Sequence, residues 1–191
     1  MNRTTLAFLL STAFALAACG SRNDADNVAG ADDLNATVSN DMNSAADMNT
    51  AAGTVDSAFL TDAMKGDNSE VALGKIAQSK GSSQGVKDLG TMLVTDHGAH
   101  KTEVAGIAQH NGVAVTDDIM DEAKTLETKL NGLSGAAFDK AFVDAAVEDH
   151  QKDIAKYEAQ AKSGDATTAA LANKTLPTLR KHLETAQKLQ K

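Results

Sequence analysis

Apolar residues recur at intervals of three and four along four long stretches of the chain, and this spacing predicts amphipathic helices. Residues that cap or stop helices bound each stretch. A shorter helix is expected over about residues 117–130, and no stretch alternates apolar and polar residues as a strand does. The predicted fold class is therefore all-α. The four long helices are expected over residues 57–80, from Ser82 or Ser83 to Asn111, from Ser134 to Ser163, and from Asp165 to the C-terminus.

The turns around Gly81 and Gly164 are only a few residues long. Short turns make consecutive long helices antiparallel, so two helical hairpins are expected. The longer connection, which carries the short helix, would join them. The natural packing is an antiparallel four-helix bundle of residues 57–191, and a body of this size can bury one core.

The first 18 residues have the order of a secretory signal peptide. Arg3 precedes an apolar run that is too short to span a bilayer, and small residues follow it. A buried helix or a true membrane anchor is the alternative, but polar residues follow the run at once. The segment Leu16-Ala17-Ala18-Cys19 resembles the lipobox of bacterial lipoproteins. That resemblance implies cleavage before Cys19 and acylation of the cysteine.

Cys19 is the only cysteine of the chain, so an internal disulfide is excluded. Gly20, and not an aspartate, follows it, which in such lipoproteins implies transfer to the outer membrane. Several acyl chains would anchor the protein stably, and we expect the helical body to face the periplasm. The membrane is then a partner through the lipid on Cys19.

Residues 19–56 are mostly Asn, Asp, Ala, Ser, Thr and Gly, with no aromatic residue and no proline. Such a segment cannot bury enough apolar surface to fold, so it is expected to be a disordered tether spanning roughly 30–36 Å. Removal of residues 1–18 takes away Arg3 and no acid, which changes the formal net charge from -8 to -9. This charge argues against nucleic acid as a partner and mildly favours cations.

Each long helix is predicted to place one metal-ligating side chain on its apolar stripe. The distances along the helices give both hairpins the same offset of about four residues, or roughly 6 Å, between their two candidates. His100 lies about 60° to one side of His97 around the helix and is a further candidate, whereas His110 projects about 140° away at a helix end and is given no role. The four stripe residues are Glu70, His97, His150 and His182.

Two interpretations of this convergence stay open. A buried glutamate among imidazoles needs either a metal ion or a hydrogen-bonded polar layer. For a metal, imidazole and carboxylate ligands suit zinc first, and copper or nickel next. Asp96 or Asp149 would be placed to orient a histidine.

Four segments of this sequence resemble the family called domain of unknown function 4142, and the resemblance covers about residues 57–190. It implies a ferritin-like four-helix fold, frequent lipidation and an outer-membrane or periplasmic location, but no reaction. The segments are Asn68-x-Glu70, Asp96-His97, Glu148-Asp149-His150, and Leu176-Pro177 with His182-Leu183.

The sequence departs from ferritin-like di-iron proteins, which use Glu-x-x-His on two helices. Val94 and Leu179 stand three positions before His97 and His182, so a di-iron centre is not expected. The main hypothesis is a lipid-anchored envelope protein that binds one divalent metal. A non-catalytic structural or stress-related interaction module is the alternative. An enzyme ranks last, because no nucleophile–base pair and no glycine-rich phosphate loop is apparent.

Overall fold

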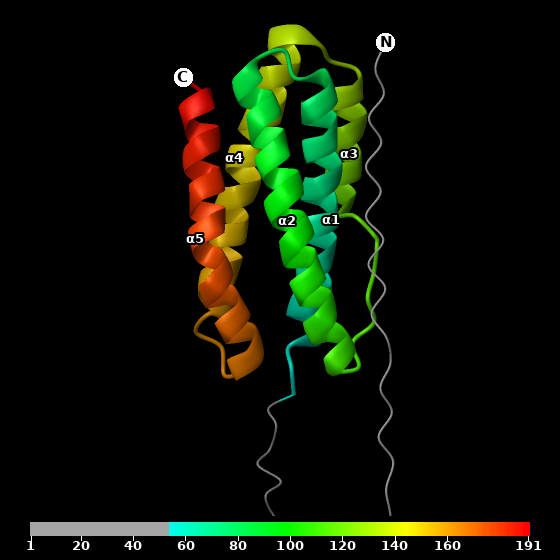
Figure 1. Cartoon of the computed structure of the whole chain (residues 1–191), viewed down its shortest axis with the longest axis vertical. Helices are drawn as coiled ribbons and strands as arrows, with labels where there is room; N and C mark the ends of the chain where they lie inside the picture. Colours follow the sequence, from blue (N-terminus) through cyan, green and yellow to red (C-terminus); the bar gives the residue numbers. More distant parts are fainter. Residues whose placement is uncertain (1–53) are drawn as a thin grey trace, which may run out of the picture. The chain divides into compact units, whose positions relative to one another are not determined.

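The computed structural model describes residues 54–191, which form four long helices, one short helix and no strand (Figure 1). The expected signal peptide, Cys19 and nearly all of the expected tether lie outside the described residues. None of the described helices is long and apolar enough to cross a membrane. The helices are α1 (Ser57–Lys80), α2 (Gln84–His110), α3 (Asp121–Asn131), α4 (Gly135–Gln160) and α5 (Ala166–Leu189).

Most ends of the long helices lie within two residues of their predicted places, because the capping chemistry is local. The exception is the end of α4, which lies at Gln160, three residues before its predicted end. The first helix ends at Lys80, directly before Gly81. Gly112 follows α2 with a φ of 70°, a left-handed conformation that glycine adopts without a Cβ penalty. Side-chain carboxylates or hydroxyls accept hydrogen bonds from backbone N–H groups in the first turns of three helices. These capping residues are Asp56 for α1, Ser83 for α2 and Asp165 for α5.

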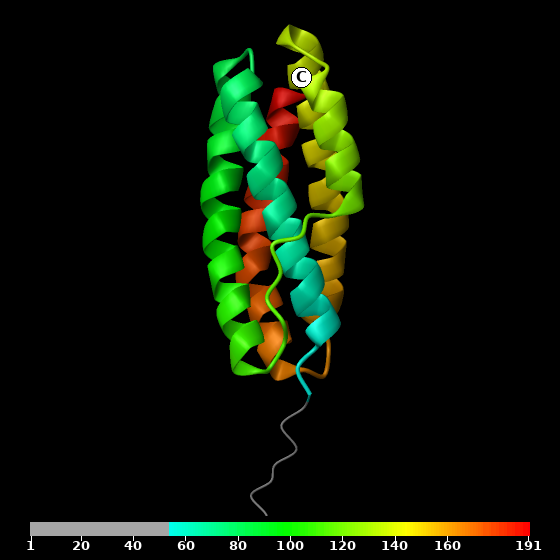
Figure 2. The same ribbon diagram turned by 90° about the vertical axis from the view of Figure 1, so that its right-hand side faces the viewer.

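The short helix begins at Asp121, four residues after its predicted start. Residues 113–120 are not helical and run along α1, as Figure 2 shows. The side-chain amide of Asn68 donates to the backbone carbonyls of Thr116 and Asp118, at 3.0 and 2.9 Å. These long-range hydrogen bonds hold the segment extended, and no local pattern in the segment reveals them.

The two hairpins pack so that every long helix is antiparallel to its main neighbours. Figures 1 and 2 show α1 and α5 running in one direction and α2 and α4 in the other. The long connection between α2 and α4 makes this possible, because it returns the chain to the end at which α2 began. The main contacts are α1 with α2, α2 with α5, α5 with α4 and α4 with α1, and α3 packs on α1 and α4.

The core consists of two apolar clusters with a polar layer between them. The first contains Leu73, Leu89 and Phe142, and the second contains Leu60, Val104 and Leu179. On each long helix the polar residues stand between positions of the two clusters. The buried acids and histidines of this layer are Asp67, Glu70, His97, His150 and His182.

Helices α1 and α2 approach each other closely at Gly74 and Gly90, about one to two turns from this layer. A Cβ on Gly74 would lie 2.8 Å from the Gly90 carbonyl oxygen, and a Cβ on Gly90 would lie 2.7 Å from that of Gly74. No real Cβ is accommodated at such distances. The two glycines therefore fix how closely α1 and α2 pack.

Candidate metal centre

Three histidines from three helices meet in the polar layer. His97 of α2, His150 of α4 and His182 of α5 are 5%, 1% and 1% exposed. Each can offer one ring nitrogen such that the three lie within 4.8 Å of one another. The His150 Nε2 and His182 Nδ1 atoms are 3.2 Å apart. Two nitrogen ligands of a tetrahedral zinc ion lie roughly 3.3 Å apart, so this spacing fits one shared ion.

The outer nitrogen of each of these imidazoles is held by an oxygen atom. Ligating histidines characteristically donate their second N–H to a carboxylate or carbonyl, which fixes the tautomer and the ring orientation. The three contacts, all of 2.9 Å, join His97 Nδ1 to Asp67 Oδ1, His150 Nδ1 to the Ala146 carbonyl oxygen, and His182 Nε2 to Asp96 Oδ2. The other nitrogen of each ring is thereby left for an inward partner.

The pair His150 and His182 has fewer protons than its contacts require. Two neutral imidazoles carry two N–H groups, and the carboxylate of Asp96 and the carbonyl of Ala146 can only accept. Both N–H groups are used in those two contacts. The inward nitrogens then present lone pairs to each other across 3.2 Å. A positive group, either a third proton or a metal ion, belongs between them.

The surroundings of these rings disfavour the third proton. Burial, with the nearby His97 and His182, lowers the pKa of His150 to about 3. Burial also lowers the pKa of His182, although its hydrogen bond to Asp96 acts in the opposite direction. At neutral pH both rings are therefore neutral bases, which is the form that binds a metal.

His97 completes the group with a nitrogen that has no partner. Its Nε2 atom is buried and makes no hydrogen bond to any described residue. Its ring centroid lies 5.2 Å from that of His182 and 5.7 Å from that of His150. A buried polar atom without a partner is costly, and a cation among the three inward nitrogens would remove this cost.

His100 is close to the centre but does not join the three histidines. Its Nδ1 atom contacts both carboxylate oxygens of Asp67, at 2.8 and 3.0 Å, so Asp67 accepts from His97 and His100 together. The Nε2 atom of His100 is buried without a partner among the described residues. A cavity of about 20 Å³, large enough for one water molecule, adjoins both histidines.

Glu70 stands apart from the expected four-residue set. It is 3% exposed and groups with Asp149 and His150, so only His150 is common to it and the triad. Burial, then the carboxyl of Asp149, raise the pKa of Glu70 well above its usual value. Glu70 does not group with His97 and His182 because it lies on the side of His150 that faces α1 and α3, where a groove opens.

Two acids of the centre were not predicted from the sequence. Asp67 lies between Ala63 and Glu70 at the helical spacing of four and three residues, so the α1 stripe already contained it. Asp153 lies one turn after His150, and burial with the charge of Asp149 raises its pKa to about 6. The sequence signal for both is an acid at helical spacing from the residues of the apolar stripe.

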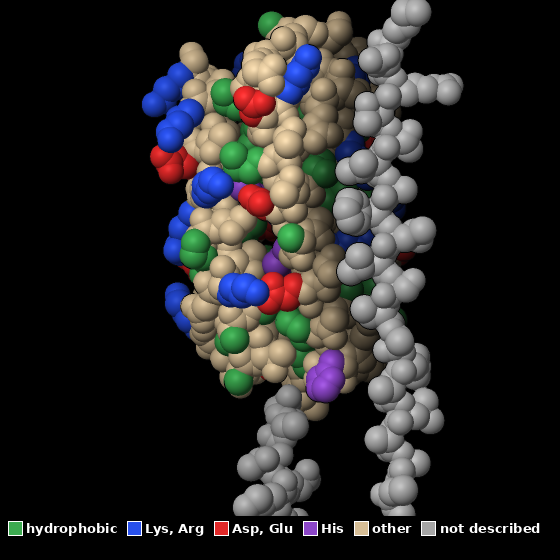
Figure 3. Space-filling model, in the orientation of Figure 1, with side chains coloured by type: hydrophobic (Ala, Val, Ile, Leu, Met, Phe, Trp, Pro, Cys, Tyr) green, Lys and Arg blue, Asp and Glu red, His purple; other side chains and the backbone are tan. Residues whose placement is uncertain are grey.

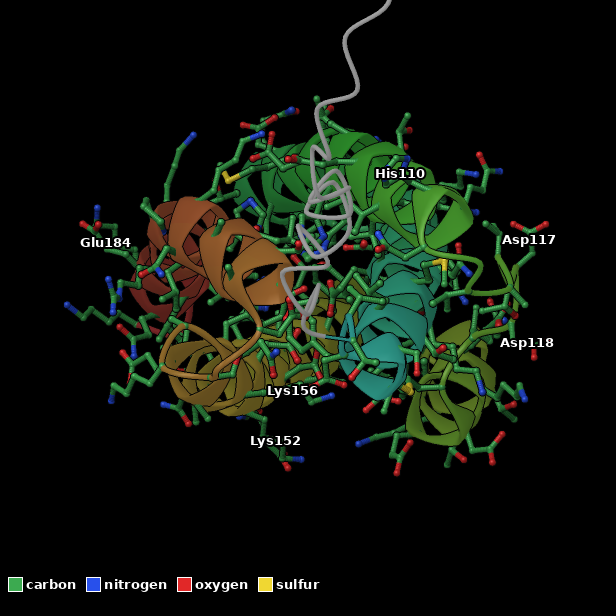
Figure 4. All side chains as sticks on the ribbon, turned by 90° about the horizontal axis from the view of Figure 1, so that it is seen from below. His110, Asp117, Asp118, Lys152, Lys156 and Glu184 are labelled. Atoms are coloured by element: carbon green, nitrogen blue, oxygen red, sulfur yellow. The ribbon has the colours of Figure 1, made fainter. Side chains whose placement is uncertain are left out.

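The outer surface differs from this interior. On the face seen in Figure 3, basic and acidic side chains are interspersed, and histidine is seen mainly at the lower end, where α2 ends. His110 is the exposed last residue of α2 and is labelled in Figure 4, far from the triad along the helix. It therefore offers a matched control for the buried histidines.

The sequence profile of one protein family, described as Domain of unknown function (DUF4142), matches residues 41–189. This match covers most of the chain and all of the triad. Comparison with curated proteins finds no match, and comparison with solved structures finds none.

Proposed function

The chain belongs to the DUF4142 family, and we propose that its helical domain binds one divalent transition-metal ion through His97, His150 and His182. The single observation that carries this proposal is the arrangement of the ring nitrogens. Every outer nitrogen has an oxygen acceptor, and every inward nitrogen is left to a shared centre. Zinc is the first candidate, and copper or nickel the next, because all three prefer imidazole ligands.

Three protein nitrogens leave one coordination position of a tetrahedral zinc ion open. The three histidines around the ion are at most 5% exposed, so a substrate would have little access to this position. We therefore infer metal handling, as a store, carrier or sensor in the cell envelope, in preference to an enzyme. The three acceptor oxygens around the site support firm retention, because outer hydrogen bonds of this kind raise metal affinity about 10- to 100-fold.

The test is a metal analysis of the chain purified without a polyhistidine tag. We expect close to one metal ion per chain, and an affinity loss of about 100-fold or more for His97→Gln, since a ligand matters at least as much as its hydrogen-bond partner. The control is His110→Gln, which changes the same residue type on the same helix at an exposed position. Equal affinities for these two variants would contradict the proposal.

A second candidate function has one observation in its favour. The contacts Ala146–His150–His182–Asp96 form a continuous chain from α4 through α5 to α2. With one extra proton on the histidine pair, this chain is a satisfied polar layer that fixes the register of the hairpins, as in a structural or interaction module. A melting temperature that responds neither to chelator nor to added zinc would favour this candidate.

The path of the chain supports a ferritin-like bundle. In that fold, two antiparallel hairpins are joined by one long crossover, and metal ligands project inward from facing helices. The α1–α2 and α4–α5 hairpins and the connection over residues 111–134 have this order. The missing Glu-x-x-His pairs distinguish the proposed centre from the di-iron centres of such proteins.

The lipobox-like segment ending at Cys19 supports an outer-membrane anchor, with the domain facing the periplasm. Incorporation of a labelled fatty acid tests this part of the proposal. We expect the label in the unaltered chain and not in Cys19→Ser. Equal labelling of the two would refute the anchor without affecting the metal site.

A further inference from the structure

A second group of potential ligands lies directly beside the histidine triad and shares His150 with it. One oxygen each of Glu70 and Asp149 and one nitrogen of His150 lie within 4.8 Å of one another. Glu70 and His150 are buried, and Asp149 is exposed. The group thus runs from the protein surface to the ring whose Nε2 atom faces the proposed ion.

Glu70 has no basic partner in this group. The charged neighbours that act on it are all acids, namely Asp149, Asp153 and Asp67. It takes part in none of the salt bridges among the described residues. A carboxyl group that is 3% exposed beside other carboxyls is costly when it is ionised, so in the absence of a cation Glu70 keeps a proton, which it shares with Asp149. A divalent cation among these ligand atoms would take the place of that proton.

The group opens into a groove between α1, α3 and α4. This groove has a volume of about 710 Å³, and Glu70, Asp149 and Asp153 contribute to its wall. Three lysines also line it. Lys129 lies on α3 and takes part in none of the salt bridges among the described residues, whereas the other two each pair with another acid and lie on an exposed part of α4 (Figure 4). These pairs are Lys152 with Glu148, at 2.6 Å, and Lys156 with Asp62, at 3.2 Å. The charges that act on Glu70 itself are those of Asp149, Asp153 and Asp67.

We propose that Glu70 and Asp149 form a loading site, which takes a divalent cation from the groove and passes it to the triad by way of His150. This inference rests on the proposed metal-binding function. Asp149 meets the hydrated ion at the surface, Glu70 replaces part of its water inside the groove, and His150 is the first ligand common to both groups. The carboxylates carry the ion through the layer that otherwise separates solvent from three buried imidazoles.

A loading site changes rates and leaves the equilibrium alone. Acids that focus an incoming cation raise the association rate, typically by a factor of 10 or more. Because the same carboxylates would also ligate the ion transiently on its way out, their removal slows dissociation by a similar factor. We therefore expect Asp149→Asn and Glu70→Gln each to slow association and dissociation about 10-fold, with the dissociation constant unchanged within about threefold.

The experiment is stopped-flow mixing of the metal-free chain with Co²⁺, followed by the visible absorption of the bound ion, and then transfer to excess EDTA. The matched control is Glu122→Gln, which removes one negative charge from the same groove wall outside the ligand group. Asp149→Asn is an exposed substitution and is expected to fold normally, so the test does not depend on the buried Glu70 variant alone.

The measured rates and affinities distinguish a failure of the loading site from a failure of the proposed function. Slower binding and release in Asp149→Asn and Glu70→Gln, but not in Glu122→Gln, supports the loading site. Unchanged rates in both variants overturn it and leave the proposed triad intact. Weaker equilibrium binding of Glu70→Gln at an unchanged association rate also overturns it, because Glu70 is then a ligand of the resident ion. If the unaltered chain binds no Co²⁺, the proposed function fails, and the loading site with it.

Discussion

Replacement of Asp67 by asparagine tests the organisation of the centre without touching a proposed ligand. The carboxylate of Asp67 is 3% exposed and accepts hydrogen bonds from two imidazoles. His97 Nδ1 lies 2.9 Å from it, and His100 Nδ1 lies 2.8 Å from it. Asparagine has nearly the same shape but only one acceptor oxygen. In Asp67→Asn, the amide oxygen can still accept from His97 Nδ1, but this acceptor carries no charge, and the amide NH₂ group takes the place of the oxygen 2.8 Å from His100 Nδ1.

The magnitude follows from the interaction that is lost. A hydrogen bond to a charged group contributes about 1.5–3 kcal/mol. Since 1.4 kcal/mol corresponds to a factor of ten in affinity, a loss of about 2 kcal/mol weakens metal binding roughly 30-fold. The full effect falls on the metal-bound state, because a metal withdraws electrons from the His97 ring and strengthens its N–H as a donor. The expected rise in the dissociation constant is therefore about 10- to 100-fold.

Competition with a chromophoric chelator at pH 7.5 measures this change for zinc. Asp62→Asn is the matched control, because it removes the same charge from the same helix at an exposed position that pairs with Lys156. Circular dichroism of both variants checks that the helices are intact. If Asp67→Asn and Asp62→Asn bind zinc with affinities within a factor of two, Asp67 does not support a ligand and the reasoning fails.

Further outcomes follow from the same structure. Gly90→Ala should lower the free energy of unfolding by about 1–3 kcal/mol in urea titrations, since its Cβ would meet the Gly74 carbonyl oxygen at 2.7 Å. Gly98→Ala, whose Cβ would have nothing within 4 Å, should raise the free energy of unfolding by about 0.5–1 kcal/mol. The reverse order would contradict the close approach of α1 and α2. Burial raises the pKa of Asp153 to about 6, so the ionised side chain destabilises the fold increasingly as the pH rises from about 4 to 6. Asp153→Asn should then stabilise the metal-free domain by about 1–2 kcal/mol at pH 8 and change its stability little near pH 4. The expected gain is smaller than the free energy that corresponds to two pKa units, because the residue is partly exposed. Equal effects at the two pH values would refute the shift. Removal of metal by EDTA should lower the melting temperature by roughly 10 °C if the ion was present at about a thousand times its dissociation constant, and calorimetry with and without EDTA measures this.

The positions of the long helices were predictable because their determinants are local. Asp165 and Ser83 cap helices through contacts two or three residues away, and Gly81 stops α1 directly. The inward positions of His97 and His182 followed from helical periodicity alone. Such features need no knowledge of what packs against them.

The contacts of the centre could not be predicted in the same way. Periodicity placed Glu70 and His150 on inward faces, but the rotation and depth of α1 against α4 decide that Glu70 meets Asp149 and not all three histidines. Asp96 was expected only as one of two residues that might orient a ring, and its contact with His182 joins positions 86 residues apart. Long-range hydrogen bonds of Asn68 likewise moved the start of α3.

The triad takes one histidine from the α1–α2 hairpin and two from the α4–α5 hairpin. Each hairpin is built from contacts close in sequence and can form quickly, whereas docking of the two brings together residues far apart along the chain. The three nitrogens meet only after docking, so an ion can bind to all three only when the last step of folding is complete. Such an ion would chiefly slow the separation of the hairpins, and its signature would be a lower unfolding rate at a nearly unchanged folding rate.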